Sequence, residues 1–307
     1  MSIHLLLPAL RYFEEVARQG SLRKAEERLH VAASAINRQI LKLEDELGVP
    51  LFERLPRGLR LSAAGELILY QIRQWQRDER QLLEYLDDIK GAGCAEIRIA
   101  TVESLTDEVL PALLRDFSAR FPKVRFVLMT CMTDMILEKI AAGDADIGIC
   151  INPPPTRKIR FIQWVDLRFG AVVAPSHPLA EKDTVRFRDC SLYPAILPDD
   201  EMFRGSTLEQ VLAHSAIELN PLAACNRILA IKSLARTGLG VAFLNKLDIA
   251  RELEHGELVF KPLQDKNIAK ARLALCTAAE RPLPTAVAVM AEQLKEALFT
   301  IDKPSER

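Results

Sequence analysis

The sequence predicts an all-helical N-terminal part followed by an α/β part, and three observations carry that prediction. Residues 1–61 show short amphipathic helices and one hairpin signal, residues 62–90 form one long helical pattern, and the remaining chain alternates strand-like and helix-like segments. Such alternation is typical of a mainly parallel sheet covered by helices. Because 307 residues exceed the size of one ordinary domain, we expect separate folding units.

The composition indicates a folded globular protein. Hydrophobic residues make up 49% of the chain and charged residues 27%, which are values of a packed chain rather than a disordered one. Because the formal net charge is −1, any nucleic acid would have to be bound by a local basic patch, and basic residues do gather between residues 23 and 60, interleaved with acidic ones. No apolar run reaches the length of a membrane span and the N-terminus resembles no secretory signal, so we expect a cytoplasmic protein without membrane contact.

Capping signals divide the first 48 residues into three helices. Pro8 suits a first helical position, and Gly20 ends that helix. Ser21 is an N-cap for a short second helix, and Gly48 is suited to end the third. Two helices joined by a short turn predict a helix-turn-helix, with the third helix as the recognition helix.

A hairpin signal follows the third helix. Pro56, Arg57 and Gly58 lie between two short apolar runs, which is typical of a hairpin tip. A basic hairpin at this place is a wing, so residues 1–61 are predicted to form a winged helix-turn-helix.

Residues 62–93 are predicted to be a linker helix followed by a hinge. Ser62 caps the helix, and Gly91 and Gly93 end it. Its apolar residues are spaced alternately four and three apart with one polar interruption, as in a coiled coil: Ile68, Ile72, Trp75, Glu79, Leu82, Leu86 and Ile89. Such a narrow stripe needs a partner, either the same chain or a second copy. We expect a second copy, because helix-turn-helix proteins commonly act as symmetric dimers.

From residue 94 the chain predicts an α/β architecture. The expected strands are 96–100, 124–129, 145–150, 169–174 and 271–276, and the expected helices are 106–121, 134–142, 207–215, 228–236 and 285–299. The cysteines in this part show no short spacing, so we expect reduced, buried side chains, although a redox pair formed in space is not excluded by sequence. The histidines show no metal spacing, and no nucleophile elbow or phosphate-binding loop is present.

The N-terminal segment resembles the LysR family of transcriptional regulators almost throughout. The matching runs are LRYF at 10–13, GSL at 20–22, AEERLHV at 25–31, RQI at 38–40, LE at 43–44, ELGVPLFER at 46–54 and AG at 64–65. The resemblance implies a DNA-binding regulator with a two-lobed sensor domain similar to type II periplasmic binding proteins. It implies lobe I at residues 94–163 and 268–303 and lobe II at 164–267.

The candidate DNA-binding residues follow from helix geometry and from this resemblance. An α-helix fits the major groove, where Arg can bridge guanine acceptors and Asn can pair with adenine. Helix N-termini suit phosphates, and a basic wing suits the minor groove. The candidates are Ser21, Arg23, Ser34, Asn37, Arg38, Lys42, Arg54 and Arg57. The plainer alternative is that Arg38 and Lys42 form a solvated face.

One departure from the family pattern lies at the start of the third helix. Many family members have Ser-Gln where this chain has Ala32 and Ala33. Losing the hydroxyl weakens a helix cap by about 1 kcal/mol. Losing the amide removes a DNA contact, which alters the sequence that is read rather than the ability to bind.

The resemblance also implies effector contacts between the lobes. Ser104 follows the first strand of lobe I and precedes a helix, where it could donate to an anion, and Thr133 lies similarly after the second strand. Phe203 and Arg204 precede a helix of lobe II, and Arg204 could hold a carboxylate bidentately. Each could instead be a cap or turn residue, but the family places ligand contacts at Ser104 and Thr133. Some carboxylate-sensing relatives have an Arg where this chain has Ile151 and Asn152, which weakens the expectation of a dicarboxylate effector.

The sequence therefore predicts a regulator that lacks catalysis, metal and cofactor. The expected partners are double-stranded DNA carrying a promoter inverted repeat, a small-molecule effector, and further copies in a dimer or dimer of dimers, with RNA polymerase as a partner left open. An enzyme built on the α/β part would need a reactive constellation, and none is recognised. A solute-binding protein would need an export signal.

Overall fold

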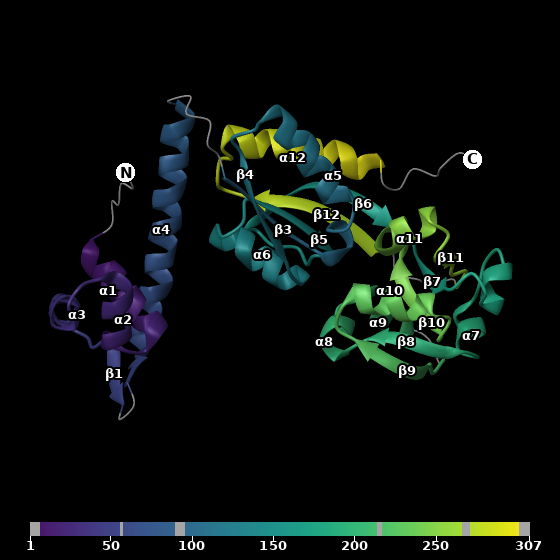
Figure 1. Ribbon diagram of the computed structural model, residues 1–307, viewed down its shortest axis with the longest axis horizontal. Coiled ribbons are helices and arrows are strands. Elements are labelled where there is room, and N and C mark those ends of the chain that lie inside the picture. Colours follow the sequence, from purple (N-terminus) through teal and green to yellow (C-terminus); the bar gives the residue numbers. More distant parts are fainter. Residues whose placement is uncertain (1–6, 56–57, 90–95, 214–216, 266–270, 301–307) are drawn as a thin grey trace. The chain divides into compact units, whose positions relative to one another are not determined.

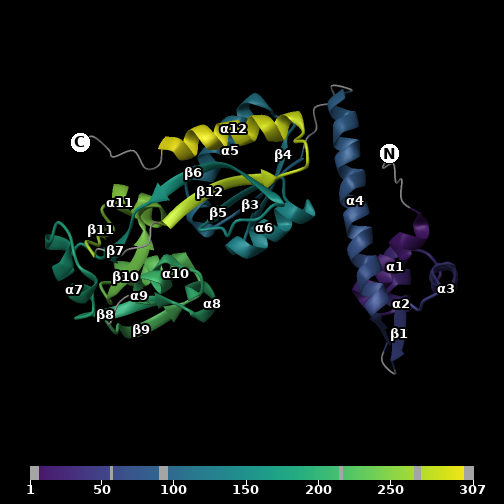
Figure 2. The same ribbon diagram turned by 180° about the vertical axis from the view of Figure 1, so that it is seen from behind.

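A computed structural model covers residues 7–55, 58–89, 96–213, 217–265 and 271–300. The chain divides into two compact units, Met1–Ala92 and Gly93–Arg307 (Figures 1 and 2). Within the residues covered, no helix is long and apolar enough to cross a membrane.

The first unit is helical with one small hairpin. Its elements are α1 (Pro8–Gln19), α2 (Leu22–Leu29), α3 (Ala33–Leu47), β1 (Phe52–Leu55), β2 (Gly58–Leu61) and α4 (Ala63–Ile89). Phe13, Val16, Ala25, Ile36 and Ile40 are buried in its core, so α1, α2 and α3 pack around one apolar centre.

The predicted helix boundaries in this unit are confirmed, because their signals are local. Pro8 begins α1, and Gly20 and Gly48 end α1 and α3 in the left-handed region with φ of 62° and 69°. Ser21 occupies the N-cap of α2 without a side-chain cap hydrogen bond. Ala32 is the N-cap of α3 and likewise supplies no side-chain bond, as its missing hydroxyl predicts.

The hairpin is fixed to α1 by a glycine contact. β1 and β2 pair antiparallel with Leu55 opposite Gly58. Gly58 has φ of +118°, and a Cβ there would lie 2.6 Å from the Gly20 carbonyl oxygen. Leu59 N–H donates to the same oxygen at 2.9 Å. Only glycine accommodates both the backbone angle and this close approach, so the base of the wing has one position relative to α1.

The predicted seam of α4 is buried in the first turns of the helix and exposed further along. Ile72 is fully buried in the core of its own unit, and Ile68 packs against that core. Further along, Trp75 and Leu82 are 40% and 48% exposed. The first turns of α4 therefore follow the alternative that the seam packs on its own chain, and the later turns expose apolar side chains that no described residue of the first unit covers. The side chains of Leu86 and Ile89 lie outside the described residues.

The second unit contains two sheets and the helices that cover them. In chain order its longer elements are β3 (Glu96–Thr101), α5 (Val109–Arg120), β4 (Arg125–Thr130), α6 (Thr133–Ala142), β5 (Ile147–Ile151), β6 (Ile159–Leu167), β7 (Phe169–Val173), α7 (Phe187–Cys190), β8 (Pro194–Pro198), α8 (Asp200–Phe203), α9 (Thr207–Ala213), β9 (Asn220–Cys225), α10 (Ile228–Arg236), β10 (Val241–Asn245), α11 (Ala250–Glu254), β11 (Val259–Pro262), β12 (Ala271–Ala278) and α12 (Thr285–Thr300). Three 3-10 turns join them: η1 (Glu103–Leu105), η2 (Pro178–Glu181) and η3 (Lys246–Ile249).

The two sheets define two lobes. The lobe I sheet has the order β4-β3-β5-β12-β6, and the lobe II sheet has the order β11-β7-β10-β8-β9. Both are mixed rather than mainly parallel. β6 and β12 in lobe I, and β7 and β11 in lobe II, run antiparallel to their neighbours. The chain passes from lobe I to lobe II between β6 and β7, and it returns between β11 and β12. The antiparallel strands are therefore the four that flank the two crossings.

The first crossing lies between Leu167 and Phe169, a few residues later than the expected boundary after residue 163. β6 continues along β12 as far as the pairing of Leu167 with Ala271, so nothing ends the strand earlier. The return crossing includes residues 266–270, which lie outside the described residues.

Helices cover both faces of each sheet. In lobe I, α5 and α12 lie on one face and α6 on the other (Figures 1 and 2). In lobe II, Val172 packs with α10 on one face, whereas its neighbours Ala171 and Val173 pack with α7 and α9 on the other. This alternation is the two-residue period of a strand buried on both sides.

Candidate nucleic-acid interface and inter-lobe pocket

The outer face of α3 carries the predicted polar side chains. Ser34, Arg38 and Lys42 are exposed, and Asn37 is half-buried beside them. On the opposite face Ile36 and Ile40 are buried in the core. The helical period therefore fixes α3 to the unit by its apolar stripe and directs the polar stripe to solvent.

A surface hollow joins this face to the wing and to the start of α2. It measures about 390 Å³. Its lining includes three of the predicted residues, Ser21, Arg23 and Asn37, together with Leu55 and Gly58 from the hairpin. Three separate stretches of sequence thus meet at one surface, as a helix-turn-helix with a wing requires.

Several acidic residues near this surface are engaged within the protein. Glu44 accepts the backbone N–H groups of Leu51 and Phe52 at 2.7 and 3.1 Å, which fixes the start of the hairpin. Glu53 pairs with Arg60 across the hairpin at 2.6 Å. These carboxylates hold the backbone and pair with cations, so they repel a polyanion less than their number suggests.

The cationic side chains of the interface differ in whether they form ion pairs within the protein. Within the described part of the chain, Arg23 and Arg38 make no ion pair, whereas Lys42 lies 3.6 Å from Glu46 on the next turn. An exposed pair of this kind contributes little and opens easily. Arg57 and the side chain of Arg54 lie outside the described residues, so their predicted roles stay predictions.

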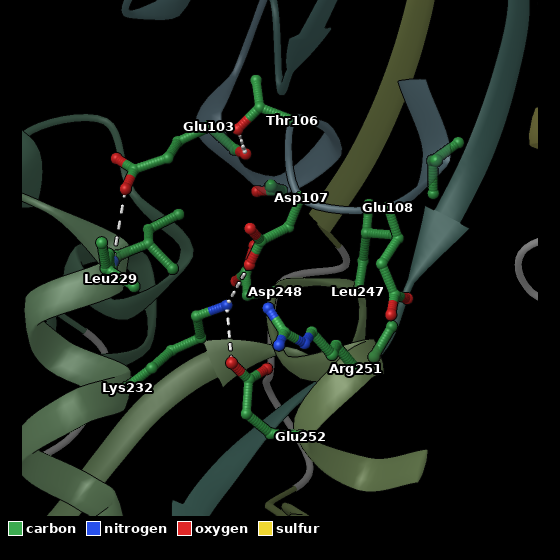
Figure 3. Close-up of a pocket in the computed structure, with 14 residues that line it drawn as sticks. Glu103, Thr106, Asp107, Glu108, Leu229, Lys232, Leu247, Asp248, Arg251 and Glu252 are labelled. Atoms are coloured by element: carbon green, nitrogen blue, oxygen red, sulfur yellow. Dashed lines mark hydrogen bonds and ion pairs between the residues drawn. The ribbon is translucent and has the colours of Figure 1, made fainter. Parts of the chain in front are cut away.

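A second candidate site lies between the two lobes. It is a pocket of about 120 Å³ (Figure 3). Lobe I lines it with η1 and the start of α5, and lobe II with α10, η3 and α11. The lining residues are Glu103, Ser104, Thr106, Asp107, Glu108, Val109, Ile228, Leu229, Lys232, Leu247, Asp248, Ala250, Arg251 and Glu252.

Lys232 joins the lobes at this pocket. Its ammonium lies 2.9 Å from Asp107 of lobe I and 2.9 Å from Glu252 of lobe II, between the two carboxylates in Figure 3. Burial alone would lower the pKa of Lys232, but the hydrogen bonds to Asp107 and Glu252 outweigh burial and raise it. The same hydrogen bond lowers the pKa of Asp107. Lys232 is therefore charged and shared between the lobes.

A second contact between the lobes involves Glu103. Its carboxylate accepts the backbone N–H of Leu229, near the N-terminus of α10, at 3.2 Å and lies 3.9 Å from Arg227. A carboxylate is favoured there because the first turn of a helix has unpaired N–H groups and a positive dipole end.

Asp248 is a deeply buried acid of the pocket. Burial raises its pKa, although the Ser104 hydroxyl and the backbone N–H of Asn245 favour the ionised form. Asn245 N–H donates to Oδ2 at 2.8 Å. Ser104 Oγ, Asp248 Oδ1 and Glu252 Oε2 are buried and make no hydrogen bond of good geometry with any of the residues that the structure describes.

The structure does not bring the four predicted effector residues together. Ser104 lines the pocket. Thr133 begins α6, and its hydroxyl donates to the Ile151 carbonyl at 2.8 Å, which ties the helix to β5. Phe203 packs against the lobe II core, and Arg204 is exposed, with Nε donating to the Asp200 carbonyl at 3.1 Å.

Ser104 was predicted from the sequence, but none of the ionisable residues of the pocket was, of which Lys232, Asp248 and Glu252 are the buried ones. One signal was present for the lysine. Lys232 shares the apolar face of α10 with Ile228, Ile231 and Ala235 at helical spacing, and a lysine there must find a buried partner. The two acids carry no comparable signal: Asp248 bonds locally to Asn245 as an ordinary capping residue, and Glu252 meets Lys232 only in the folded lobe.

The cysteines that are fully buried behave as small apolar side chains. Cys150, Cys190 and Cys276 are buried, and burial raises the pKa of Cys190 to about 12. A hydrogen bond with the neighbouring thiol of Cys276, together with burial, raises the pKa of Cys150. Thiols held protonated in this way are unreactive. Among the described residues no cluster of His, Cys, Asp or Glu could hold a metal ion.

Comparison with known protein families matches both units. Residues 7–66 match the model described as a bacterial regulatory helix-turn-helix protein of the lysR family, and residues 90–299 match the LysR substrate binding domain.

Individual relatives are distant but similar over most of their length. The RuBisCO operon transcriptional regulator of Allochromatium vinosum is 26% identical over 257 residues, covering 84% of this chain and 85% of the relative. A probable RuBisCO transcriptional regulator of Porphyra purpurea is 27% identical over 270 residues, covering 86% and 85%.

Solved structures are similar in fold. Full-length CbnR complexed with its target DNA gives a TM-score of 0.70 at 22% identity, covering 94% of this chain and 98% of that one. Full-length OxyR from Pseudomonas aeruginosa gives 0.67 at 24% identity, covering 96% of each chain.

Proposed function

This chain belongs to the LysR family of bacterial regulatory proteins, and from that membership we propose how it reads DNA and how a small molecule controls it. It is a DNA-binding transcriptional regulator with an effector-binding domain, and its family is not one of enzymes. The recognition surface is the outer face of α3 with the adjoining hollow and wing. Its place of action is the cytoplasm, where promoter DNA lies, and RNA polymerase is a further proposed partner.

The observation that carries the DNA-binding proposal is the arrangement around α3. Asn37 and Arg38 face outward on a helix of the size that enters a major groove, and these side chains suit adenine and guanine edges. Ser21 and Arg23 border the same hollow at the start of α2, where backbone N–H groups suit a phosphate. Arg57 of the wing is assigned to the minor groove or its phosphates.

A gel-shift and footprinting experiment on the DNA that flanks its own gene tests this proposal. Arg38→Ala is expected to weaken binding by about tenfold or more, because one bidentate base contact contributes about 1–3 kcal/mol. Arg57→Ala is expected to shorten the footprint at the wing. Arg115→Ala, an exposed arginine of the second unit, is the matched control and leaves binding unchanged. Unchanged footprints in both test variants refute the assignment.

We also propose a dimer, or a dimer of dimers, on an inverted repeat. The exposed apolar side chains of Trp75 and Leu82 on α4 support this, because a second copy of α4 would bury them. Sedimentation of Leu82→Glu is expected to show a shift toward the monomer. Retention of the wild-type assembly contradicts α4 as the contact.

The effector proposal places a small molecule between the lobes, with Ser104 among its contacts. The pocket lined by both lobes supports this, since a ligand there can favour one arrangement of the lobes over another. Thr133, Phe203 and Arg204 do not line this pocket, so a contact of theirs with an effector is a separate proposal. Thermal-shift screening with small acids, amino acids and amines, followed by Ser104→Ala, tests the proposal: a true effector raises the unfolding temperature of the wild type more than that of the variant.

A further inference from the structure

In the inter-lobe pocket the ammonium of Lys232 and the backbone N–H of Leu229 are already engaged, whereas some of the acceptors are unfilled. Lys232 is held by Asp107 and Glu252, and the Leu229 N–H of α10 donates to Glu103. An anionic ligand would have to displace one of these carboxylates. The remaining cation of the lining, Arg251, is exposed rather than buried.

The unfilled acceptors lie on three side chains from both lobes. Among the described parts of the chain, Ser104 Oγ of lobe I and Asp248 Oδ1 and Glu252 Oε2 of lobe II have no hydrogen-bond partner of good geometry, and each of the three residues is at least nine-tenths buried. Buried polar atoms are normally satisfied, so each such atom calls for an explanation. The Ser104 hydroxyl is itself a donor and favours the ionised form of Asp248, so the acceptor that most needs a donating group is Glu252 Oε2.

The charge of the lining favours a cation. Five carboxyl groups line the pocket, from Glu103, Asp107, Glu108, Asp248 and Glu252, against two cationic side chains, those of Lys232 and Arg251. Among the residues that the structure describes, no group of acids is placed to hold a metal ion. A cation with N–H groups meets both requirements, because it supplies charge and donors together.

We propose that this pocket binds a small organic ammonium ion, a primary amine whose N–H groups donate to Ser104, Asp248 and Glu252. The volume of about 120 Å³ equals the share of about four water molecules in liquid water, so the ligand has only a few non-hydrogen atoms.

Such a ligand would act on the contact between the lobes. Glu252 holds Lys232 through one oxygen and would hold the amine through the other, and Lys232 also reaches Asp107 of lobe I. Binding therefore changes the balance of charge at the residues that join the lobes. This step rests on the proposed function, in which the arrangement of the lobes controls DNA binding.

Calorimetric titration of the full chain with ethanolamine tests the proposal directly. Ethylene glycol has the same number of non-hydrogen atoms without the charge, and glycolate has the opposite charge. We expect saturable binding of ethanolamine alone. Equal binding of ethylene glycol, preferential binding of glycolate, or no binding of any of the three overturns the proposal.

Two variants locate the site. Ser104→Ala is expected to weaken ethanolamine binding by about tenfold, since a hydrogen bond to a charged group is lost. Ser118→Ala, which removes an exposed hydroxyl elsewhere in lobe I, should leave binding unchanged. Glu252→Gln is expected to abolish binding, with unfolding curves recorded to verify that the variant is folded. If ethanolamine binds Ser104→Ala as tightly as it binds the wild type, the assignment of the amine to this pocket is wrong.

Failure of this inference and failure of the proposed function are distinguishable. If the chain binds its flanking DNA but no amine, only the pocket assignment fails. If the chain binds ethanolamine but shows no preference for that DNA, the proposed promoter recognition fails while the pocket assignment stands.

Discussion

The two candidate sites hold their charged side chains in opposite ways. On α3, Arg38 and Lys42 are exposed, and Arg38 makes no ion pair within the described part of the chain. In the inter-lobe pocket, Lys232, Asp248 and Glu252 are buried and linked to the backbone or to each other. The first site presents charge to a partner, whereas the second uses charge to join parts of its own chain.

Because of this difference, charged residues at the first site affect DNA affinity, whereas those at the second affect the stability of the fold. Exposed cations cost the fold little and gain affinity for DNA by releasing counterions from the phosphates. Buried charges contribute to stability only while their partners remain, because an unpaired buried charge is strongly unfavourable. Substitutions at the first site should therefore change affinity alone, and substitutions at the second should change the free energy of unfolding.

The largest effect is expected from Lys232→Met. Removing the ammonium leaves Glu252 and Asp107 uncompensated, and breaking a buried pair costs about 3–5 kcal/mol. Lys295→Met is the control, because Lys295 forms an exposed pair with Glu292 that contributes at most about 1 kcal/mol. Urea unfolding of the full chain measures both. Equal effects of the two substitutions would remove the distinction between the sites.

A comparable effect is expected from Ile72→Ala in α4. Ile72 is fully buried, so its truncation costs about 2–5 kcal/mol of unfolding free energy. Leu82→Ala on the exposed stretch should change stability much less and weaken self-association instead. Unfolding curves and sedimentation of the two variants separate these roles, and an Ile72→Ala variant as stable as the wild type contradicts the buried assignment.

Gly58→Ala should lower the stability by a smaller amount, and it tests whether the contact with Gly20 fixes the position of the hairpin. The substitution forces a left-handed φ and a Cβ 2.6 Å from the Gly20 oxygen, at a cost of about 1–3 kcal/mol. Gly48→Ala shares the left-handed φ but meets no atom within 4 Å, so it should cost less. Thermal unfolding compares them. If Gly48→Ala is the more damaging substitution, the contact with Gly20 does not fix the hairpin.

The smallest effect is a dependence on pH at Asp248. Burial raises its folded pKa above the ordinary value of about 3.9 in the unfolded chain. Its contribution to stability is then fully present below about pH 3.9 and is lost as pH rises through the folded pKa. Asp248→Asn removes this contribution. The unfolding free energy of the wild type minus that of the variant should therefore fall as pH rises, and a difference that rises contradicts the assignment.

The DNA-binding unit could be predicted from the sequence because its determinants are local. Pro8, Gly20 and Gly48 mark helix ends by their own backbone preferences, and the polar face of α3 follows from helical spacing. Which part of the α4 seam is buried and which is exposed could not be predicted from local signals. Ile72 and Leu82 lie on the same predicted seam, and only the packing of α1 against α4 decides which of them is buried.

The inter-lobe pocket could not be predicted in the same way. Its residues come from η1 of lobe I and from α10 and α11 of lobe II, which lie more than a hundred positions further along the chain, and they meet only when the lobes form. Ser104 was found through a family resemblance. Lys232 carried a readable signal on an apolar helix face, but nothing local indicated that Asp107 and Glu252 would be its partners.

Competitive anisotropy titration measures whether α3 reads a particular DNA sequence. The full chain is titrated at physiological salt with the duplex that flanks its own gene and with a scrambled duplex of equal composition, for the wild type and for Arg38→Ala. We predict wild-type binding to the flanking duplex that is tighter by about a thousandfold or more, and a reduced ratio in the variant. Equal affinity of the wild type for both duplexes would contradict the account.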